Sequence, residues 1–262
     1  MGAEQAILSE VRDAVGILTI NRPKTLNALD LPTLLEMEAA LDAFEADDSV
    51  RVIIVTGAGD RAFVAGGDIA DLVSRQGLAH YVEFAEVVHR VFRRFERCDK
   101  PTIAAVNGWA LGGGTELVLS LDIRILADTA RLGLPEITLG LFPGAGGTQR
   151  ITRQVPLCRA KELMFTGENI DAETAVAIGL ANRVVPRDQL MDEALALAAK
   201  MTNKSPLVLK LLKRTLGDGA EMSLAASLAH EQAMIGLVLD SADAHEGCSA
   251  FLEKRAPNFT GK

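Results

Sequence analysis

The chain is poor in aromatic residues, which make up 4% of its 262 residues, so its core must be built from Ala, Val, Leu and Ile. It has three cysteines, Cys98, Cys158 and Cys248, which lie far apart and show neither CxxC nor Cys/His spacing. That pattern argues against a disulfide framework and a zinc site, and we expect no metal. Idle thiols in a reducing compartment are the simplest interpretation.

The chain also lacks an excess of positive charge and a long hydrophobic run. Its formal net charge of −8 argues against a general nucleic-acid-binding protein, although a local group of Lys and Arg still allows a small anionic ligand. No apolar run reaches the roughly 18 residues of a membrane span. The first ten residues carry two acids and no base, unlike a signal or transit peptide, and Ala6 stands where myristoylation needs Ser or Thr. We expect a cytoplasmic protein that binds neither membrane nor nucleic acid.

Strand and helix signals alternate over the first 186 residues. Short apolar, β-rich runs at 14–21, 51–57, 101–108 and 123–127 predict strands, and 51–57 is apolar enough to be buried on both faces. Between them, Asp30 predicts a helix start, 78–97 a long helix and 116–121 a buried one. This rhythm predicts an α/β fold with parallel strand pairing.

From residue 187 onward the signal is helical only. Helical spacing occurs at 188–201, 205–216, 220–238 and 241–253. We therefore divide the chain into an α/β core, 1–186, which holds the site, and a C-terminal helical region, 187–262. The helical region either packs on the core or reaches a neighbouring subunit.

Three glycine-rich loops, 65–68, 112–114 and 143–147, lie at predicted strand ends. Glycine lets the backbone approach a ligand closely. Free N–H groups at a helix start bind an anion or stabilise a developing one. Tight packing at a strand–helix turn explains any single loop equally well. None of the three is a Walker loop or a GxGxxG fingerprint, so we expect no bound cofactor.

Two glutamates lie beside these loops: Glu116 follows Gly114 in a first helical turn, and Glu136 follows Pro135. Taken alone, Glu116 is more simply explained as a partner of the helix dipole, and Glu136 as a solvated side chain. Their neighbours are apolar, however, and burying a carboxylate raises its pKa and costs stability. Two carboxyl groups in a dry site are one way to run acid and base chemistry at neutral pH.

Other catalytic patterns have little support. The four histidines all fall on predicted helices and show no metal-ligand spacing. No serine lies in a GxSxG elbow, so hydrolysis by that route is not indicated.

Several blocks across nearly the whole chain resemble the enoyl-CoA hydratase/isomerase (crotonase) family in order and spacing. They are NRPKTLNAL (21–29), AFVAGGDI (62–69), AVNGWALGGGTEL (105–117), LPEITLGLFPGAGGTQR (134–150), MFTGENI (164–170), AVAIGLANRVVP (175–186) and AFLEKRAPNF (250–259). The resemblance implies a crotonase-like spiral of ββα repeats with a C-terminal helical subdomain. It also implies an acyl-CoA thioester as substrate, so that coenzyme A is part of the substrate, and assembly as a homotrimer or homohexamer.

The resemblance also implies roles for particular residues. The backbone N–H groups of Gly67 and Gly113 would form an oxyanion hole around the thioester oxygen. The other expected substrate contacts are Ala65, Gly66 and Asp68 beside the CoA channel, Gly144 at the catalytic water, and Lys24, Phe251 and Lys254 at the nucleotide end, the last two from this subunit or another. Asp68 is itself expected to cap the short helix that follows it.

Glu116 and Glu136 match the two glutamates of the hydratase members, including their separation of 20 residues. The resemblance thus implies hydration of a trans-2-enoyl-CoA to a 3-hydroxyacyl-CoA. One glutamate would take a proton from the water that adds at Cβ, and a proton would be delivered to Cα. Isomerases of the family often keep one glutamate, and isomerase, dehydratase, hydrolase and decarboxylase reactions share most of the site.

Two readings from other classes are disfavoured. An RNA-binding protein conflicts with the acidic balance, and a pseudo-enzyme conflicts with the intact glutamate pair. Two departures from the family pattern are Ala70, where many members have lysine, and Leu121, where a smaller residue is usual. Ala70 is expected to weaken a contact with a CoA phosphate.

Overall fold

The computed structural model describes residues 5–262, and what we inferred about residues 1–4 lies outside this range. A six-stranded sheet of order β1-β2-β3-β5-β7-β10 forms the centre of the core. All its neighbouring strands are parallel except the antiparallel pair β1 and β2. Its strands are β1 (Ile7–Arg12), β2 (Val15–Ile20), β3 (Val52–Gly57), β5 (Thr102–Val106), β7 (Ile123–Ala127) and β10 (Arg183–Val185).

A second, four-stranded sheet has the order β4-β6-β8-β9, with only β8 and β9 antiparallel. Its strands are β4 (Ala62–Val64), β6 (Trp109–Leu111), β8 (Arg131–Gly133) and β9 (Ile170–Asp171). β4, β6 and β8 each follow a strand of the first sheet and precede helical turns. The chain therefore climbs through repeated ββα turns, which confirms the predicted crotonase-like spiral.

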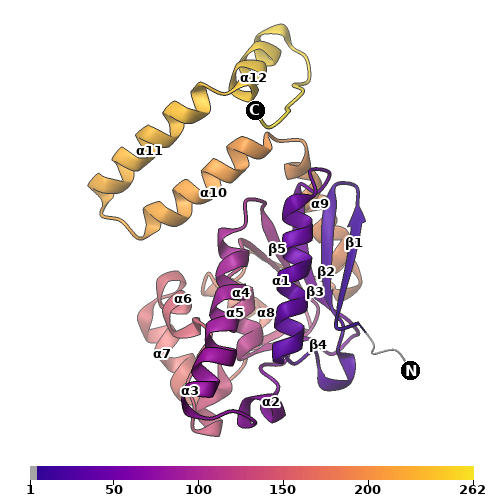
Figure 1. The fold of residues 1–262 in the computed structure, drawn as a ribbon, viewed down its shortest axis with the longest axis vertical. Helices are drawn as coiled ribbons and strands as arrows, with labels where there is room; N and C mark the ends of the chain where they lie inside the picture. The colour runs from indigo at the N-terminus through magenta and orange to yellow at the C-terminus, as the bar shows by residue number, and fades with distance from the viewer. Residues whose placement is uncertain (1–4) are drawn as a thin grey trace.

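The helices of the core connect and cover these strands (Figure 1). They are α1 (Leu31–Ala46), α2 (Ile69–Val73), α3 (Gly77–His80), α4 (Glu86–Arg97), α5 (Gly113–Leu119), α6 (Gly147–Gln154), α7 (Leu157–Thr166), α8 (Ala172–Ala177) and α9 (Leu190–Thr202). Short 3₁₀ turns occur at Pro23–Thr25, Pro135–Leu139 and Arg187–Gln189. Every residue of β3 and β5 is buried, as their apolar runs predict.

The long helix predicted over 78–97 is interrupted. α3 and α4 are joined by a π-helical turn, Tyr81–Ala85, so the segment stays helical but widens for one turn. Asp30 caps α1 as predicted: its side chain accepts from the Thr33 N–H at 2.9 Å, and a proline lies in the first turn.

The C-terminal helices divide into two groups. α9 lies on the first sheet and buries Leu190, Ala194 and Ala198. The next two helices, α10 (Pro206–Ala220) and α11 (Leu224–Leu239), pair with each other, have no buried residue and stand off the core with α12 (Ala242–Glu253) (Figure 1). The part that projects from the core therefore starts at α10, later than residue 187.

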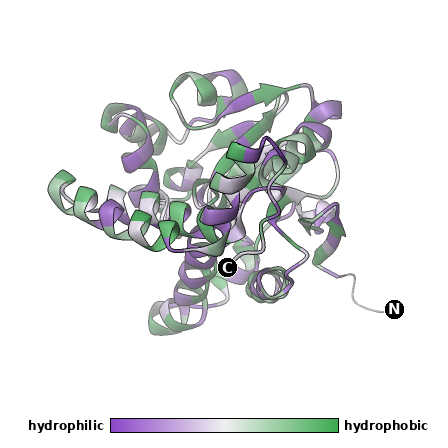
Figure 2. Cartoon of the chain, turned by 90° about the horizontal axis from the view of Figure 1, so that it is seen from above, coloured by the Kyte–Doolittle hydropathy of each residue, from purple (hydrophilic) through white to green (hydrophobic). Residues whose placement is uncertain are grey.

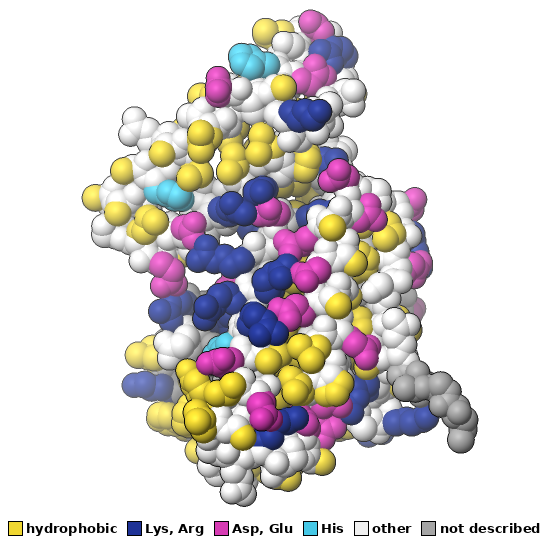
Figure 3. All heavy atoms as spheres, viewed as in Figure 1, with side chains coloured by type: hydrophobic (Ala, Val, Ile, Leu, Met, Phe, Trp, Pro, Cys, Tyr) yellow, Lys and Arg dark blue, Asp and Glu magenta, His cyan; other side chains and the backbone are white. Residues whose placement is uncertain are grey.

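The projecting helices carry many exposed apolar side chains. Seen from above, hydrophobic residues occur along their whole length (Figure 2). Figure 3 shows them on one face, above a band of Lys and Arg. The large exposed apolar residues are Leu212, Leu216, Met222, Leu224, Leu228, Ile235, Leu237, Leu239, Phe251 and Leu252. Within residues 5–262, no helix has the length and apolar character to cross a membrane.

Candidate active site

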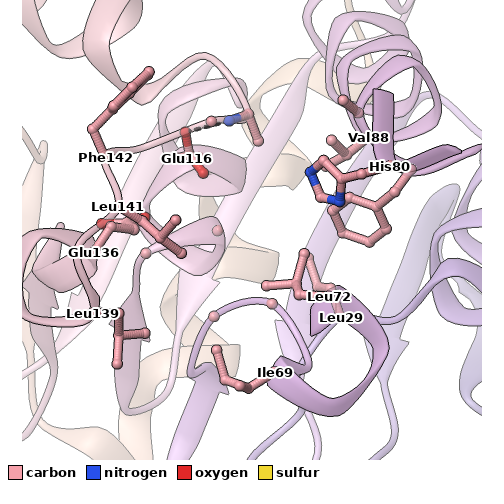
Figure 4. A pocket seen from close by; sticks show the side chains of 18 of the residues that line it. Leu29, Ile69, Leu72, His80, Val88, Glu116, Glu136, Leu139, Leu141 and Phe142 are labelled. Atoms are coloured by element: carbon pink, nitrogen blue, oxygen red, sulfur yellow. Dashed lines mark hydrogen bonds between the residues drawn. The ribbon is translucent and has the colours of Figure 1, made fainter. Parts of the chain in front are cut away.

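A cavity of about 740 Å³ lies between the glycine-rich loops and the helical segment from α2 to α4. Its wall is largely apolar. Figure 4 shows Glu116 and Glu136 on one side, with Leu29, Leu72 and His80 facing them across the space. The cavity contains two carboxyl groups within a mostly apolar surface, which is the usual composition of a small-molecule site.

Glu116 enters the cavity from the first turn of α5, where it is buried. Its Oε1 atom accepts hydrogen bonds from the N–H groups of Ala145 and Gly147, each at 2.7 Å. Burial raises the pKa of the Glu116 carboxyl, while the two N–H donors and the charge of Arg150 act in the opposite direction. The N–H groups of the third glycine loop therefore bind the side-chain carboxyl of Glu116.

Glu136 lies in the 3₁₀ turn Pro135–Leu139, which follows β8. Its buried Oε2 has no hydrogen-bond partner within residues 5–262. Burial raises the pKa of Glu136 to about 7, and the nearby charge of Glu116 adds to the rise. A carboxyl whose pKa lies near neutrality suits proton transfer at that pH.

Gly112 has no side chain, and this lets the Glu136 carboxyl lie against the glycine-rich loop 112–114 that leads to Glu116. Gly112 has φ +52°, and a Cβ there would lie 2.9 Å from Glu136 Oε1. Any other residue would combine an unfavourable backbone conformation with contact against a catalytic candidate.

The N–H groups of Gly67 and Gly113 point into the cavity without a partner. Within the described chain neither donates a hydrogen bond. A Cβ on Gly113 would lie 3.6 Å from Gly67 N, so the two donors are neighbours. Gly113 opens α5, where free N–H groups and the helix dipole both favour negative charge. The pair is built to receive an oxygen that carries negative charge.

Most of the residues predicted for the site meet in this cavity. Its lining includes Ala65, Gly66, Gly67, Gly113, Glu116, Glu136 and Gly144. Asp68 does not line it. Asp68 caps α2, as expected, accepting from Ala70 N at 3.1 Å and Asp71 N at 3.4 Å, and it is ion-paired with Arg22.

Three predicted contacts are not brought to the cavity by this chain. Lys24 lies in the 3₁₀ turn Pro23–Thr25. Phe251, on α12, is 82% exposed, and Lys254 ends that helix. Neither these two nor Lys24 lines the cavity, and the C-terminal pair lies on the projecting helices.

Some site residues were not anticipated. The N–H donors of Ala145 and Gly147, the apolar wall residues Phe92 and Phe142, and the ring of His80 stacked on Phe84 at 5.6 Å all belong to it or support it. The GAGG loop was a signal for the donors, since its anion-binding character was predicted. Which anion it binds depends on the tertiary approach of α5, which no local pattern reveals.

The cysteines stand apart from this chemistry. Cys98 is buried, and burial raises the pKa of its thiol to about 12, so it stays protonated and unreactive. Cys158 and Cys248 are exposed. Among residues 5–262, no group of three or more His, Cys, Asp or Glu side chains is arranged to hold a metal ion.

The fold and the site define a class of proteins: two-sheet ββα spirals that place two carboxyl groups beside a neighbouring pair of unpartnered backbone N–H groups. Residues 10–262 match the family model described as enoyl-CoA hydratase/isomerase. The chain belongs to the enoyl-CoA hydratase/isomerase family.

Characterised relatives and solved structures are similar along almost the whole chain. A short-chain-enoyl-CoA hydratase of Clostridium acetobutylicum is 43% identical over 95% of each chain. A crotonyl-CoA hydratase of Syntrophomonas wolfei is 42% identical over 99% of this chain and 100% of its own. The crystal structure of an enoyl-CoA hydratase from Bacillus anthracis has a TM-score of 0.94 at 37% identity, covering 98% of this chain and 100% of its own.

Proposed function

We propose that this chain is an enoyl-CoA hydratase, which adds water across the 2,3 double bond of a trans-2-enoyl-CoA to give a 3-hydroxyacyl-CoA. The observation that carries the proposal is the pair Glu116 and Glu136 facing the unpartnered N–H groups of Gly67 and Gly113. Relatives at about 40% identity, named as hydratases of short-chain enoyl-CoA and crotonyl-CoA, support it.

The thioester oxygen binds between Gly67 N–H and Gly113 N–H. As the water oxygen bonds to Cβ, the π electrons of the double bond shift toward Cα and the carbonyl group. Negative charge then builds up on the thioester carbonyl oxygen. The two N–H groups are already oriented before the reaction, so they stabilise the enolate-like state without reorganising. This is where most of the rate enhancement is expected to arise.

The two glutamates divide the proton transfers. Glu116, whose Oε1 atom accepts from the N–H groups of Ala145 and Gly147, takes a proton from the water whose oxygen bonds to Cβ. Glu136, protonated in part at neutral pH, supplies the proton that bonds to Cα. One water is added in total. Glu116 then holds a proton that Glu136 has lost, and exchange between them or with solvent restores the pair.

The remaining predicted roles are proposed on the same basis. Ala65 and Gly66 border the thioester arm, and Gly144 borders the water beside Glu116. We propose that Lys24, together with Phe251 and Lys254 of a neighbouring copy, contacts the nucleotide end of CoA, in a homotrimer or homohexamer. The apolar wall of the cavity suits a hydrocarbon acyl chain. A cytoplasmic location fits the reducing environment that its free thiols suggest.

The test is hydration of a short trans-2-enoyl-CoA, followed by the loss of the enoyl-thioester absorbance. We expect Glu116→Gln and Glu136→Gln each to lower kcat about 100-fold or more, because each removes one proton-transfer group. Glu173→Gln, exposed on α8, is the control and is expected to behave as wild type.

Two results would contradict the mechanism: no hydration by the wild-type protein, or hydration that is indifferent to both glutamates. The alternative of the same family, isomerisation through an enolate, would then be examined with a 3-enoyl-CoA. An isomerase would convert that substrate and would need only one proton-transfer carboxylate.

A further inference from the structure

The position of Glu116 depends on a backbone loop. Both of its observed hydrogen bonds come from main-chain N–H groups, those of Ala145 and Gly147. Between them lies Gly146, which is in the left-handed region with φ +102°. Because both donors belong to the loop, the position of the Glu116 carboxyl depends on the position of the loop.

Arg150 binds this loop on the side away from the cavity that holds Glu116. It lies one turn into α6, and its Nη1 atom donates to the carbonyl oxygen of Ala145 at 3.0 Å. Its guanidinium also packs over Gly146 and occupies the place that a Cβ at that position would take. The same peptide segment therefore donates to Glu116 on one side and accepts from Arg150 on the other.

Arg150 is itself anchored to another helix. Its Nε and Nη2 atoms donate to the two carboxylate oxygens of Glu96 at 3.2 and 3.1 Å. Glu96 belongs to α4, 54 residues earlier in the chain. A fork-to-fork pair of this kind fixes direction as well as distance. The Arg150 side chain is 13% exposed, so the pair is partly shielded from water.

A second cavity, of about 510 Å³, lies behind the loop. Glu96, Gly146 and Arg150 line it, whereas Ala145 and Glu116 line the first cavity. The loop is thus a thin wall between the two spaces. Across that wall the charge of Arg150 lowers the pKa of Glu116, against the larger effect of burial.

We infer that Arg150 is a positioning residue for Glu116: held by Glu96, it fixes the loop whose N–H groups orient the carboxylate toward the reacting water. The inference rests on the proposed function and adds to it a residue that does not touch substrate. It also assigns the pair Arg150 and Glu96 a role in turnover beyond the modest stability of a surface ion pair.

The test compares this pair with the ion pair between Arg153, also on α6, and Glu221 at the end of α10. Arg150→Ala is expected to lower kcat about 10- to 100-fold with little change in KM, because a small displacement of a proton-transfer group has that effect. Glu96→Gln is expected to lower kcat less. Arg153→Ala and Glu221→Gln are the controls: their ion pair, at 2.9 Å, also lines the second cavity but touches no part of the loop.

The pH profile separates positioning from general loss of structure. The acid limb of kcat/KM reports the base, here Glu116, in the free enzyme. Losing the Arg150 cation raises the pKa of Glu116, so the limb should move to higher pH in Arg150→Ala. Arg150→Lys keeps the charge and loses the fork, so it should keep the limb but recover kcat only in part. Two other titratable groups lie near the loop, Glu136 and the half-buried His89. The charge of Arg150 lowers the pKa of His89, so Arg150→Ala changes this group as well, and the shift of the limb is assigned to Glu116 where it persists in a His89→Gln background.

Each outcome bears on a different claim. A wild-type protein without hydratase activity would remove the proposed function. A wild type that turns over, with Arg150→Ala equal to Arg153→Ala in kcat and pH profile, would overturn the inference. If Arg150→Ala does not fold, Glu96→Gln and Arg150→Lys decide instead: wild-type kcat in both would overturn it, and reduced kcat at unchanged thermal stability would support it.

Discussion

Glu116 is buried and Glu136 is partly buried, and their carboxyl oxygens have different hydrogen-bond partners. Glu116 is given two N–H donors, whereas one oxygen of Glu136 has no partner within residues 5–262. A buried acceptor that is left unpaired costs stability. The protein therefore carries a local destabilisation at Glu136, which is common where a group must change protonation during a reaction.

That destabilisation should be measurable. The pKa of Glu136 is about 7 in the folded protein, against 4.5 for an unperturbed glutamate, so folding favours its protonated form. Stability contributed by this group is then greatest below pH 4.5 and falls as pH rises to about 7. We expect Glu136→Gln to be more stable than wild type by roughly 1 to 3 kcal/mol near pH 8, and by less than about 1 kcal/mol near pH 5.

Urea unfolding of both proteins at the two pH values is the measurement. Glu173→Gln, on the exposed face of α8, should show no pH-dependent difference from wild type. A stability gain of equal size at both pH values would mean that Glu136 is not destabilised by its charge.

Single site residues could be predicted from the sequence where the polarity of a side chain conflicts with the apolar character of its neighbours. Glu116 and Glu136 stood out because carboxylates lie within apolar segments, and Asp68 because a cap precedes a helix. Arg150 could not be assigned from sequence, because an arginine on a helix is a common feature. Only the structure shows that the loop it contacts holds Glu116. Its significance comes from the approach of α4, α5 and α6, which are distant in sequence.

At the scale of elements, the close approach of α5 to β4 sets the geometry of the Gly67 and Gly113 N–H groups, the proposed oxyanion hole. Gly114 lies against the Val64 backbone, and a Cβ there would contact Val64 O and lie 2.9 Å from its carbonyl carbon. Only a glycine allows the helix to start so near the strand. The N–H of Gly113 is thereby brought beside that of Gly67.

We expect Gly114→Ala to destabilise the protein by roughly 2 to 4 kcal/mol, because backbone atoms must move apart to admit the methyl group. Gly236→Ala, in the middle of α11, is the matched control: nothing lies within 4 Å of the added Cβ, so about 0.5 to 1 kcal/mol of stabilisation is expected. Thermal unfolding of both variants is the measurement. A tolerated methyl at position 114 would show that α5 can shift without consequence.

Elements were predictable from sequence where the signal was long. The buried runs of β3 and β5 and the N-cap of α1 were found, as were the four C-terminal helices. The second sheet was not, because β4, β6 and β8 have three residues each and too few side chains to show a period. Their existence follows from pairing with each other, which is a tertiary property.

For the whole molecule, the projecting helices present a surface that one chain leaves uncovered. Leu224 and Leu228, on successive turns of α11, are 75% and 55% exposed. Several such side chains gathered on one unit are typical of an interface. The same unit carries Phe251 and Lys254, whose proposed contact with the nucleotide end needs a second copy.

We expect light scattering after size exclusion to give three or six times the chain mass. Leu224→Glu combined with Leu228→Glu should lower that mass while the circular dichroism spectrum is retained, because charges oppose burial between copies but harm nothing within one. Val11→Glu, exposed on the outer strand β1, is the control and should leave the mass unchanged. A wild-type monomer would remove the proposed assembly and, with it, the roles of Phe251 and Lys254.

The π-helical turn Tyr81–Ala85 bears on how this cavity can change over generations. Removing one codon there would let α3 and α4 close into one regular helix, because a π-helical turn holds about one residue more than an α-helical turn. Residues on either side of the turn, such as His80 and Val88, would keep nearly the same faces, whereas the part of the cavity wall formed by Phe84 and Ala85 would repack. The two carboxylates lie on other elements and would not move. Insertions and deletions at this turn are therefore a mutational route to a new cavity shape that leaves Glu116 and Glu136 in place.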